Sequence, residues 1–176
     1  MGPAIQMPTG QELLRACAIT AYFADCPGID LSVHRLVFAF SNGPPQIAAS
    51  RCGQAFALRT GWGSVVTWGL AYRGGDSSGV AAQLSNGVQS VTGSAGAFAA
   101  LKSGGSVVTW GIAGRGGDSS GVATQLSGGV QSVTGSCGAF AAVKSDGAVV
   151  TWGDAEYGGD SSGVAAQLSG GVQSVA

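Results

Sequence analysis

A short Gly-Asp-Ser-Ser-Gly motif comes nearest to a catalytic pattern in this sequence. It occurs three times, at residues 75–79, 117–121 and 159–163. A nucleophilic serine needs a base within hydrogen-bond reach, and the single histidine, His34, lies outside all three copies. A motif present three times with one available base is typical of a structural turn. We therefore expect no catalytic residue and no enzymatic activity.

The acidic and sulfur-containing side chains show no metal-ligand spacing. The motif aspartates recur only every 42 residues, whereas a calcium site needs several oxygen ligands from one place. We expect each aspartate to accept a hydrogen bond from a backbone N–H of its own turn. The cysteines lack a Cys-x-x-Cys pair, so we expect neither metal nor cofactor, and we interpret the cysteines as small buried hydrophobic residues. They are Cys17, Cys26, Cys52 and Cys137.

Composition excludes several classes of protein. The 176 residues include 32 Gly, only 10% charged residues and a net charge of −1. Disordered chains combine low hydrophobicity with high net charge, and nucleic-acid binders need a basic excess, so we expect neither. The most apolar early stretch, residues 16–24, is too short to span a membrane and does not resemble a signal peptide. We expect an intracellular protein, cytoplasmic or nuclear, without membrane contact.

An internal repeat of 42 residues organises the chain. Residues 88–129 and 130–171 align without a gap, and 34 of their 42 positions are identical. A looser copy covers about residues 46–87, and a fourth begins at Val172 before the chain stops at Ala176. In the looser copy either Trp62 is one extra residue in a hairpin turn, or a strict offset aligns Phe56 with Phe98. We favour the insertion at Trp62, because a turn absorbs a residue more easily than a strand does.

Each unit is mostly β in its local pattern. Strands are predicted at 88–91, 97–102 and 106–110, and Asp146-Gly147 marks a hairpin in the third unit. Residues 122–126 fit either a fourth strand or a helical turn. Strands that are apolar on both sides indicate sheets covered on both faces. Small stacked sheets, one per unit, favour a mainly β fold, an incomplete β-propeller of about three antiparallel blades. A β-solenoid is the alternative.

Residues 1–45 differ in composition and form a separate segment with 4 of the 32 Gly. A capping box at Thr9–Glu12 predicts a helix over about 10–24. Residues 33–40 are predicted to form a strand, so we expect a short α/β segment ahead of the repeats.

The third unit, Gly138-Ala-Phe-Ala-Ala-Val-Lys-Ser-Asp-Gly-Ala-Val-Val-Thr-Trp-Gly153, resembles the repeat of the regulator of chromosome condensation family. The resemblance covers residues 46–176 and implies a β-propeller, seven-bladed in that family. It also implies an interaction module, as in large ubiquitin ligases with a HECT domain. The family's founding activity is nucleotide exchange on a small GTPase. An accessory part of such an exchange system, or the substrate-binding repeats of a ubiquitin ligase, is the alternative function.

The loop after Trp-Gly carries the best candidates for binding. It is the part where neighbouring copies differ most, reading Leu-Ala-Tyr-Arg, Ile-Ala-Gly-Arg and Asp-Ala-Glu-Tyr. Loops on a rigid scaffold usually carry binding, and Arg and Tyr are favoured anchors. Our partner-binding candidates are Arg73, Arg115, Glu156 and Tyr157. The tryptophans Trp68, Trp110 and Trp152 are predicted to lie in the core between blades. Lys102 and Lys144 flank hairpins, where we expect them to be solvated.

These features predict a non-catalytic repeat module that binds a protein partner of unknown identity. Propellers usually close with four to eight blades. Three units leave an apolar blade face uncovered, which predicts self-association through exposed blade faces.

Overall fold

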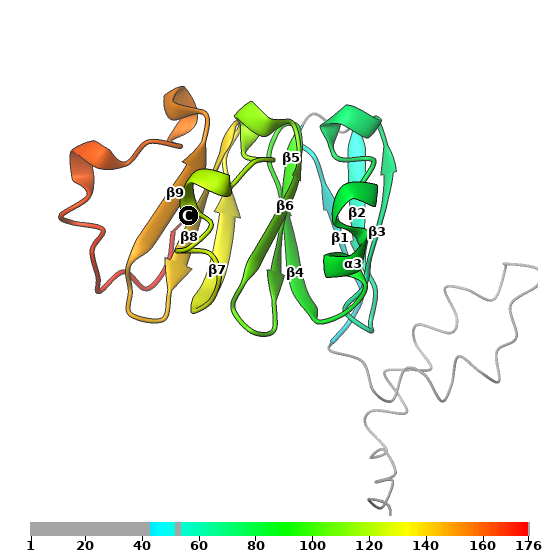
Figure 1. The fold of residues 1–176 in the computed structure, drawn as a ribbon, viewed down its shortest axis with the longest axis horizontal. Helices are drawn as coiled ribbons and strands as arrows, with labels where there is room; N and C mark the ends of the chain where they lie inside the picture. The colour runs from blue at the N-terminus through cyan, green and yellow to red at the C-terminus, as the bar shows by residue number, and fades with distance from the viewer. Residues whose placement is uncertain (1–42, 52–53, 176) are drawn as a thin grey trace, which may run out of the picture.

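Three small antiparallel sheets make up the described part of the chain, which in this computed structural model is residues 43–51 and 54–175. The sheets stand side by side in chain order, with short helical turns at their upper ends (Figure 1). The helix predicted over 10–24 and the strand predicted over 33–40 lie outside the described residues.

Each sheet has three strands whose order in space is their order in the chain. Sheet 1 contains β1 (Gln46–Ala49), β2 (Ala55–Arg59) and β3 (Val65–Gly69). Sheet 2 contains β4 (Val88–Gly93), β5 (Ala97–Lys102) and β6 (Val107–Gly111). Sheet 3 contains β7 (Val130–Gly135), β8 (Ala139–Lys144) and β9 (Val149–Gly153). The mainly β class is confirmed, and the solenoid alternative is wrong for these residues because the strands form separate antiparallel sheets.

The predicted Asp-Gly hairpin connects β8 to β9. The amide of Lys144 donates to the carbonyl of Ala148 at 2.8 Å, and the carboxylate of Asp146 accepts from the Ala148 amide at 3.0 Å. Gly147 has a φ of +78°, a left-handed conformation that favours glycine. The turn residues therefore determine the strand pairing locally.

Helical turns follow the last strand of each sheet. A first set comprises η2 (Ala71–Arg73), η4 (Ala113–Arg115) and η6 (Ala155–Tyr157). A second set comprises η3 (Ser78–Val80), η5 (Ser120–Val122) and η7 (Ser162–Val164), with α3 (Ala81–Leu84) after η3. The amide of Leu126 donates to the carbonyl of Val122, so residues 122–126 form a helical turn rather than a strand.

The core lies between the sheets. On β5 the side chains alternate, so that Phe98 and Ala100 pack toward sheet 1, while Ala99 and Leu101 pack toward sheet 3. Sheet 2 is therefore covered on both faces, as predicted. Trp110 and Trp152 are 5% and 4% exposed, which confirms their place in this core.

Trp68 is the exception among these tryptophans, because 43% of it is exposed. The prediction of a core position is wrong for this residue. Each buried tryptophan packs on the preceding sheet, and no sheet precedes sheet 1 within the described residues.

The predicted insertion at Trp62 is also wrong. Phe56 pairs with Trp68 as Phe98 pairs with Trp110, so the strict 42-residue offset holds from β2 onward. The extra length lies before β2. Ser50 accepts a hydrogen bond from the amide of Ala55, five residues later, whereas Ser94 accepts from Ala97, three residues later. The added residues lie in the connection between β1 and β2, and not in the turn between β2 and β3 that contains Trp62. A connection between strands accommodates extra residues more easily than a strand does.

Candidate functional site

The three variable turns lie together at one end of the sheets. We call residues 70–73, 112–115 and 154–157 the upper edge, after their place in Figure 1. Each turn ends at a glycine with φ of 91–93°, namely Gly74, Gly116 and Gly158. The same backbone therefore presents different side chains at three successive positions.

Arg115 and Tyr157 meet across the junction between sheets 2 and 3. The Arg115 guanidinium carbon lies 4.9 Å from the centre of the Tyr157 ring. A guanidinium over an aromatic face is attracted by the ring quadrupole. Gly138 lies beneath the pair, and a Cβ there would be 2.9 Å from the Tyr157 ring. The structure thus brings two of the predicted residues into one contact.

Arg73 makes different contacts from its counterpart Arg115. Its Nη1 donates to the carbonyl of Ala95 in the next sheet at 3.4 Å, and its guanidinium carbon lies 5.4 Å from the ring centre of Tyr72. Tyr72 is exposed. It belongs to the variable turn but was absent from our sequence candidates, although the divergence of that turn was a signal that could have included it.

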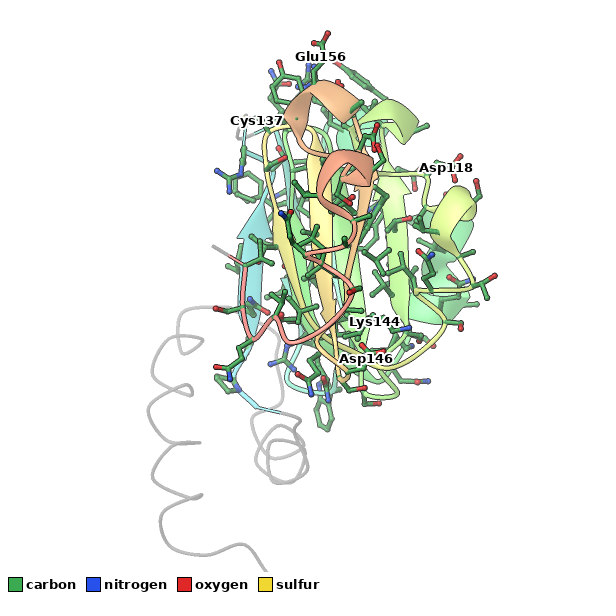
Figure 2. All side chains as sticks on the ribbon, turned by 90° about the vertical axis from the view of Figure 1, so that its left-hand side faces the viewer. Asp118, Cys137, Lys144, Asp146 and Glu156 are labelled. Carbon is green, nitrogen blue, oxygen red and sulfur yellow. The ribbon has the colours of Figure 1, made fainter. Side chains whose placement is uncertain are left out.

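Glu156 is exposed on the third turn, and Figure 2 shows it at the extreme end of the molecule. The carboxylate of Asp154 caps this turn by accepting from the Glu156 amide at 3.1 Å. The turn is also held from below, because the Ser136 hydroxyl donates to the carbonyl of Tyr157 at 2.8 Å. The Ser94 hydroxyl does the same for Arg115 at 2.9 Å. These bonds fix the turns against the sheets.

The Gly-Asp-Ser-Ser motifs form Asx-type turns. In each copy the aspartate accepts from the amide of the serine two residues later at 2.8 Å, as Asp118 does from Ser120. The preceding serine bonds a threonine of the outer strand, as Ser119 bonds Thr109 at 3.0 Å. The predicted aspartate role is confirmed. The hydrogen bond from the Ser120 amide lowers the pKa of Asp118 from its ordinary value of 3.8, and Asp76 and Asp160 show the same direction.

The opposite end of the sheets carries Lys144 and Asp146 (Figure 2). The Lys144 ammonium donates to the carbonyl of Gln125 at 2.9 Å, and Lys102 donates to the carbonyls of Gln83 and Asn86. The two lysines lie at partly exposed positions, in line with the prediction, and they also hold the end of the preceding helical segment. The cation satisfies carbonyls that a short helical turn leaves unpaired.

Cys137 is exposed in the turn between β7 and β8, so its predicted burial is wrong. It lies near the upper edge with Glu156 (Figure 2). The turn belongs to sheet 3, and no sheet follows sheet 3 within the described residues. The predicted burial of Cys17, Cys26 and Cys52 falls outside the described residues.

Arg51 links all three sheets near the upper edge and had no signal in the sequence. Its amide donates to the carbonyl of Ser94 at 2.9 Å, and its guanidinium donates to the carbonyl of Gly135 at 2.7 Å. The three sheets are therefore joined near their upper ends.

Within residues 43–51 and 54–175, no group of three His, Cys, Asp or Glu side chains is placed to hold a metal ion. None of the helices in these ranges has the length and apolar composition that crossing a bilayer requires.

Comparison with known proteins identifies no family for this chain. No family model matches the chain, and no curated protein matches it. Seventeen solved chains match it, and one is the crystal structure of human WBSCR16, at 16% sequence identity and a TM-score of 0.41. The match covers 61% of this chain and 33% of the WBSCR16 chain. The part that is similar therefore spans about a third of the length of that solved chain. A likeness at this TM-score carries no argument about function.

Proposed function

We propose that this chain is a non-catalytic repeat module of the propeller type that binds a protein partner through its upper edge. The observation that carries the proposal is the contrast between scaffold and edge. Near-identical sheets present Tyr72 with Arg73, then Arg115, then Glu156 with Tyr157, on turns with the same backbone. Rigid scaffolds with variable loops are a common arrangement for recognition.

The chemistry of the edge suits protein recognition. Arg and Tyr are enriched among the residues that dominate binding energy at interfaces. The Arg115 guanidinium rests on the Tyr157 ring, and the Ser136 and Ser94 hydroxyls hold the carbonyls of these two turns. A side chain held in place before binding loses less conformational entropy when the partner docks. Two guanidinium groups also favour a partner surface that presents carboxylates.

The resemblance to regulator of chromosome condensation repeats supports the same proposal. The resemblance rests on the Asp-Gly to Trp-Gly core of the third unit, and the structure uses those residues to build the hairpin and the junction between sheets. The upper edge is not part of that core. We therefore assign the framework to the shared residues and the binding to the variable ones.

The experiment compares two matched triple variants in affinity enrichment with quantitative mass spectrometry. The test variant is Arg73→Ala with Arg115→Ala and Tyr157→Ala. The control likewise removes two cationic side chains and one aromatic ring, but at the opposite end: Lys102→Ala with Lys144→Ala and Trp62→Ala. A partner retained by the control and lost by the test variant, and shown by calorimetry to bind the purified chain directly, supports the proposal. Equal retention by both variants would overturn it.

A further inference from the structure

The outer face of sheet 1 is an aromatic surface that repeats the residues buried between the other sheets. It consists of Ile47, Phe56, Leu58, Val66 and Trp68. Ile47 is 65% exposed, whereas its counterpart Val91 on sheet 2 is 2% exposed against sheet 1. Phe56 stacks on Trp68 at 5.4 Å, as Phe98 stacks on Trp110 at 5.4 Å. Within residues 43–51 and 54–175, the face has the form of a junction without a partner sheet.

The outer face of sheet 3 carries the complementary hollow. A cavity of about 360 Å³ is lined there by Ala139, Ala141 and Gly158, with Thr134 and Gly135 at its side. In the inner junctions the glycine equivalent to Gly158 receives a phenyl ring. A Cβ at Gly74 or Gly116 would lie 2.5 Å from the ring of Phe98 or Phe140 respectively. At Gly158 nothing lies within 4 Å of that point.

We propose that a second copy of this chain covers these faces head to tail, with sheet 1 of one copy docking on sheet 3 of the other. Phe56 enters the cavity beside Gly158. The Trp68 indole N–H donates to the carbonyl of Gly158, as Trp110 donates to Gly74 and Trp152 to Gly116, each at 3.0 Å. The new junction repeats the two that the chain already contains.

The occupant is a second copy because the chain carries both halves of the junction. The two faces are unlike each other: one projects aromatic rings, and the other is a hollow lined by small residues. Unlike faces give a heterologous contact, which closes into a ring where the rotation allows. The described residues of two copies supply six sheets, within the four to eight blades at which propellers usually close. We therefore expect a closed pair.

Docking requires one segment to move. The Thr134 hydroxyl donates to the carbonyl of Val175 at 3.0 Å, as Thr92 donates to Val133 at 3.0 Å. Residues 172–175 therefore lie where the first strand of a following sheet would lie, which is the place that β1 of the second copy takes. β1 is paired with β2 along Gln46–Ala49, whereas residues 172–175 form no strand, so the latter give way.

The test uses the full 176-residue chain and two substitutions at exposed positions, one on each face. Val66 is 52% exposed on the aromatic face, and Val164 is exposed on the hollow face, where its counterparts Val80 and Val122 pack against the cores. Val66→Asp and Val164→Asp each place a charge in the proposed junction, where its desolvation opposes docking. The masses are measured by sedimentation over a range of concentrations.

We expect the unmodified chain to reach twice its 17.2 kDa mass and each single variant to remain at 17.2 kDa. An equimolar mixture of the two variants regains the double mass, because one supplies an intact hollow face and the other an intact aromatic face. The control Leu70→Asp places aspartate where the third unit already has Asp154, and it leaves the association unchanged. Circular dichroism confirms that all variants are folded.

Three results would overturn the proposal. An unmodified chain that stays at 17.2 kDa at every concentration would show that something else covers the faces, such as residues 1–42. A single variant that still associates would indicate a contact between like faces. A mixture that stays monomeric would exclude the head-to-tail junction. Tyr157 of the upper edge lines the cavity, but neither Val66 nor Val164 belongs to that edge. The two variants therefore keep the residues of the proposed partner binding, which has its own test.

Discussion

The indole N–H of Trp110 donates a hydrogen bond of 3.0 Å to the carbonyl oxygen of Gly74, in the preceding repeat. The equivalent bond joins Trp152 to Gly116. The same glycine makes room for the stacked phenylalanine, so one backbone position both accepts the bond and admits the ring. The Trp-Gly and Gly-Gly parts of successive repeats thus form one joint between sheets.

Replacing Trp110 by phenylalanine removes the donor and leaves the buried Gly74 carbonyl without its partner. We expect Trp110→Phe to lower the free energy of unfolding by about 1–3 kcal/mol, measured by urea denaturation at low protein concentration. Trp68→Phe is the matched control, because Trp68 has the same place in its sheet but is exposed. We expect the control to change stability by about 0.5 kcal/mol or less. An equal loss of unfolding free energy in both variants would show that the hydrogen bond from Trp110 to Gly74 does not stabilise the junction between sheets.

Alanine at Gly116 and at Gly158 separates backbone strain from steric conflict. Both glycines have nearly the same left-handed conformation, with φ of +91° and +93°, so both substitutions cost about 1–2 kcal/mol in strain. At Gly116 the new Cβ also meets Phe140, which must shift and adds about 1–3 kcal/mol. At a protein concentration low enough to keep the chain monomeric, we expect Gly116→Ala to have the lower urea midpoint. If the two midpoints coincide, the ring does not fill that site.

The motif aspartates make stability depend on pH in the acid range. The pKa of Asp118 is lowered in the folded state by the Ser120 amide, so its contribution is complete above the unfolded value of about 3.8. The contribution is then lost as the pH falls through the lower, folded pKa. Asparagine keeps an acceptor oxygen but does not titrate. We expect the triple variant Asp76→Asn, Asp118→Asn, Asp160→Asn to lose less unfolding free energy than the unmodified chain between neutral pH and about pH 2.5. An identical loss would argue against these hydrogen bonds.

The contact between Arg115 and Tyr157 predicts an energetic coupling across two sheets. A double-mutant cycle with Arg115→Met and Tyr157→Leu should give about 0.5–1 kcal/mol of interaction energy in urea denaturation. Tyr157→Phe keeps the ring face and should preserve the coupling in a parallel cycle with Arg115→Met. Strict additivity in the first cycle would show that the stacking contributes nothing to stability.

Much of the fold could be predicted from local pattern. The strands at 97–102 and 107–111 were placed within a residue or so, and Asp146-Gly147 correctly predicted a hairpin. Turn residues and apolar runs act through neighbours in the chain, so they are readable from a single sequence. The position of the extra residues before β2 was not readable. The alignment with an insertion at Trp62 and the strict 42-residue offset both match glycine and apolar positions between units. Only the pairing of Phe56 with Trp68 in the structure distinguishes the two alignments.

The residues of the candidate site could be predicted from the sequence, but their contacts could not. The divergent turns identified Arg73, Arg115, Glu156 and Tyr157, but the contact of Arg115 with Tyr157 joins residues 42 positions apart. Its existence depends on how one sheet is rotated against the next. The hydrogen bond from the Arg51 guanidinium to the Gly135 carbonyl likewise depends on how the three sheets are placed relative to one another.

By itself, the sequence determined the repeat, its three strands and the turns between them, because these follow from residue types acting on their chain neighbours. Only the tertiary structure decided which copies of a repeated residue are buried. Trp68 and Trp110 have the same local sequence, yet one is exposed and the other is not, because burial depends on whether another sheet lies against that face.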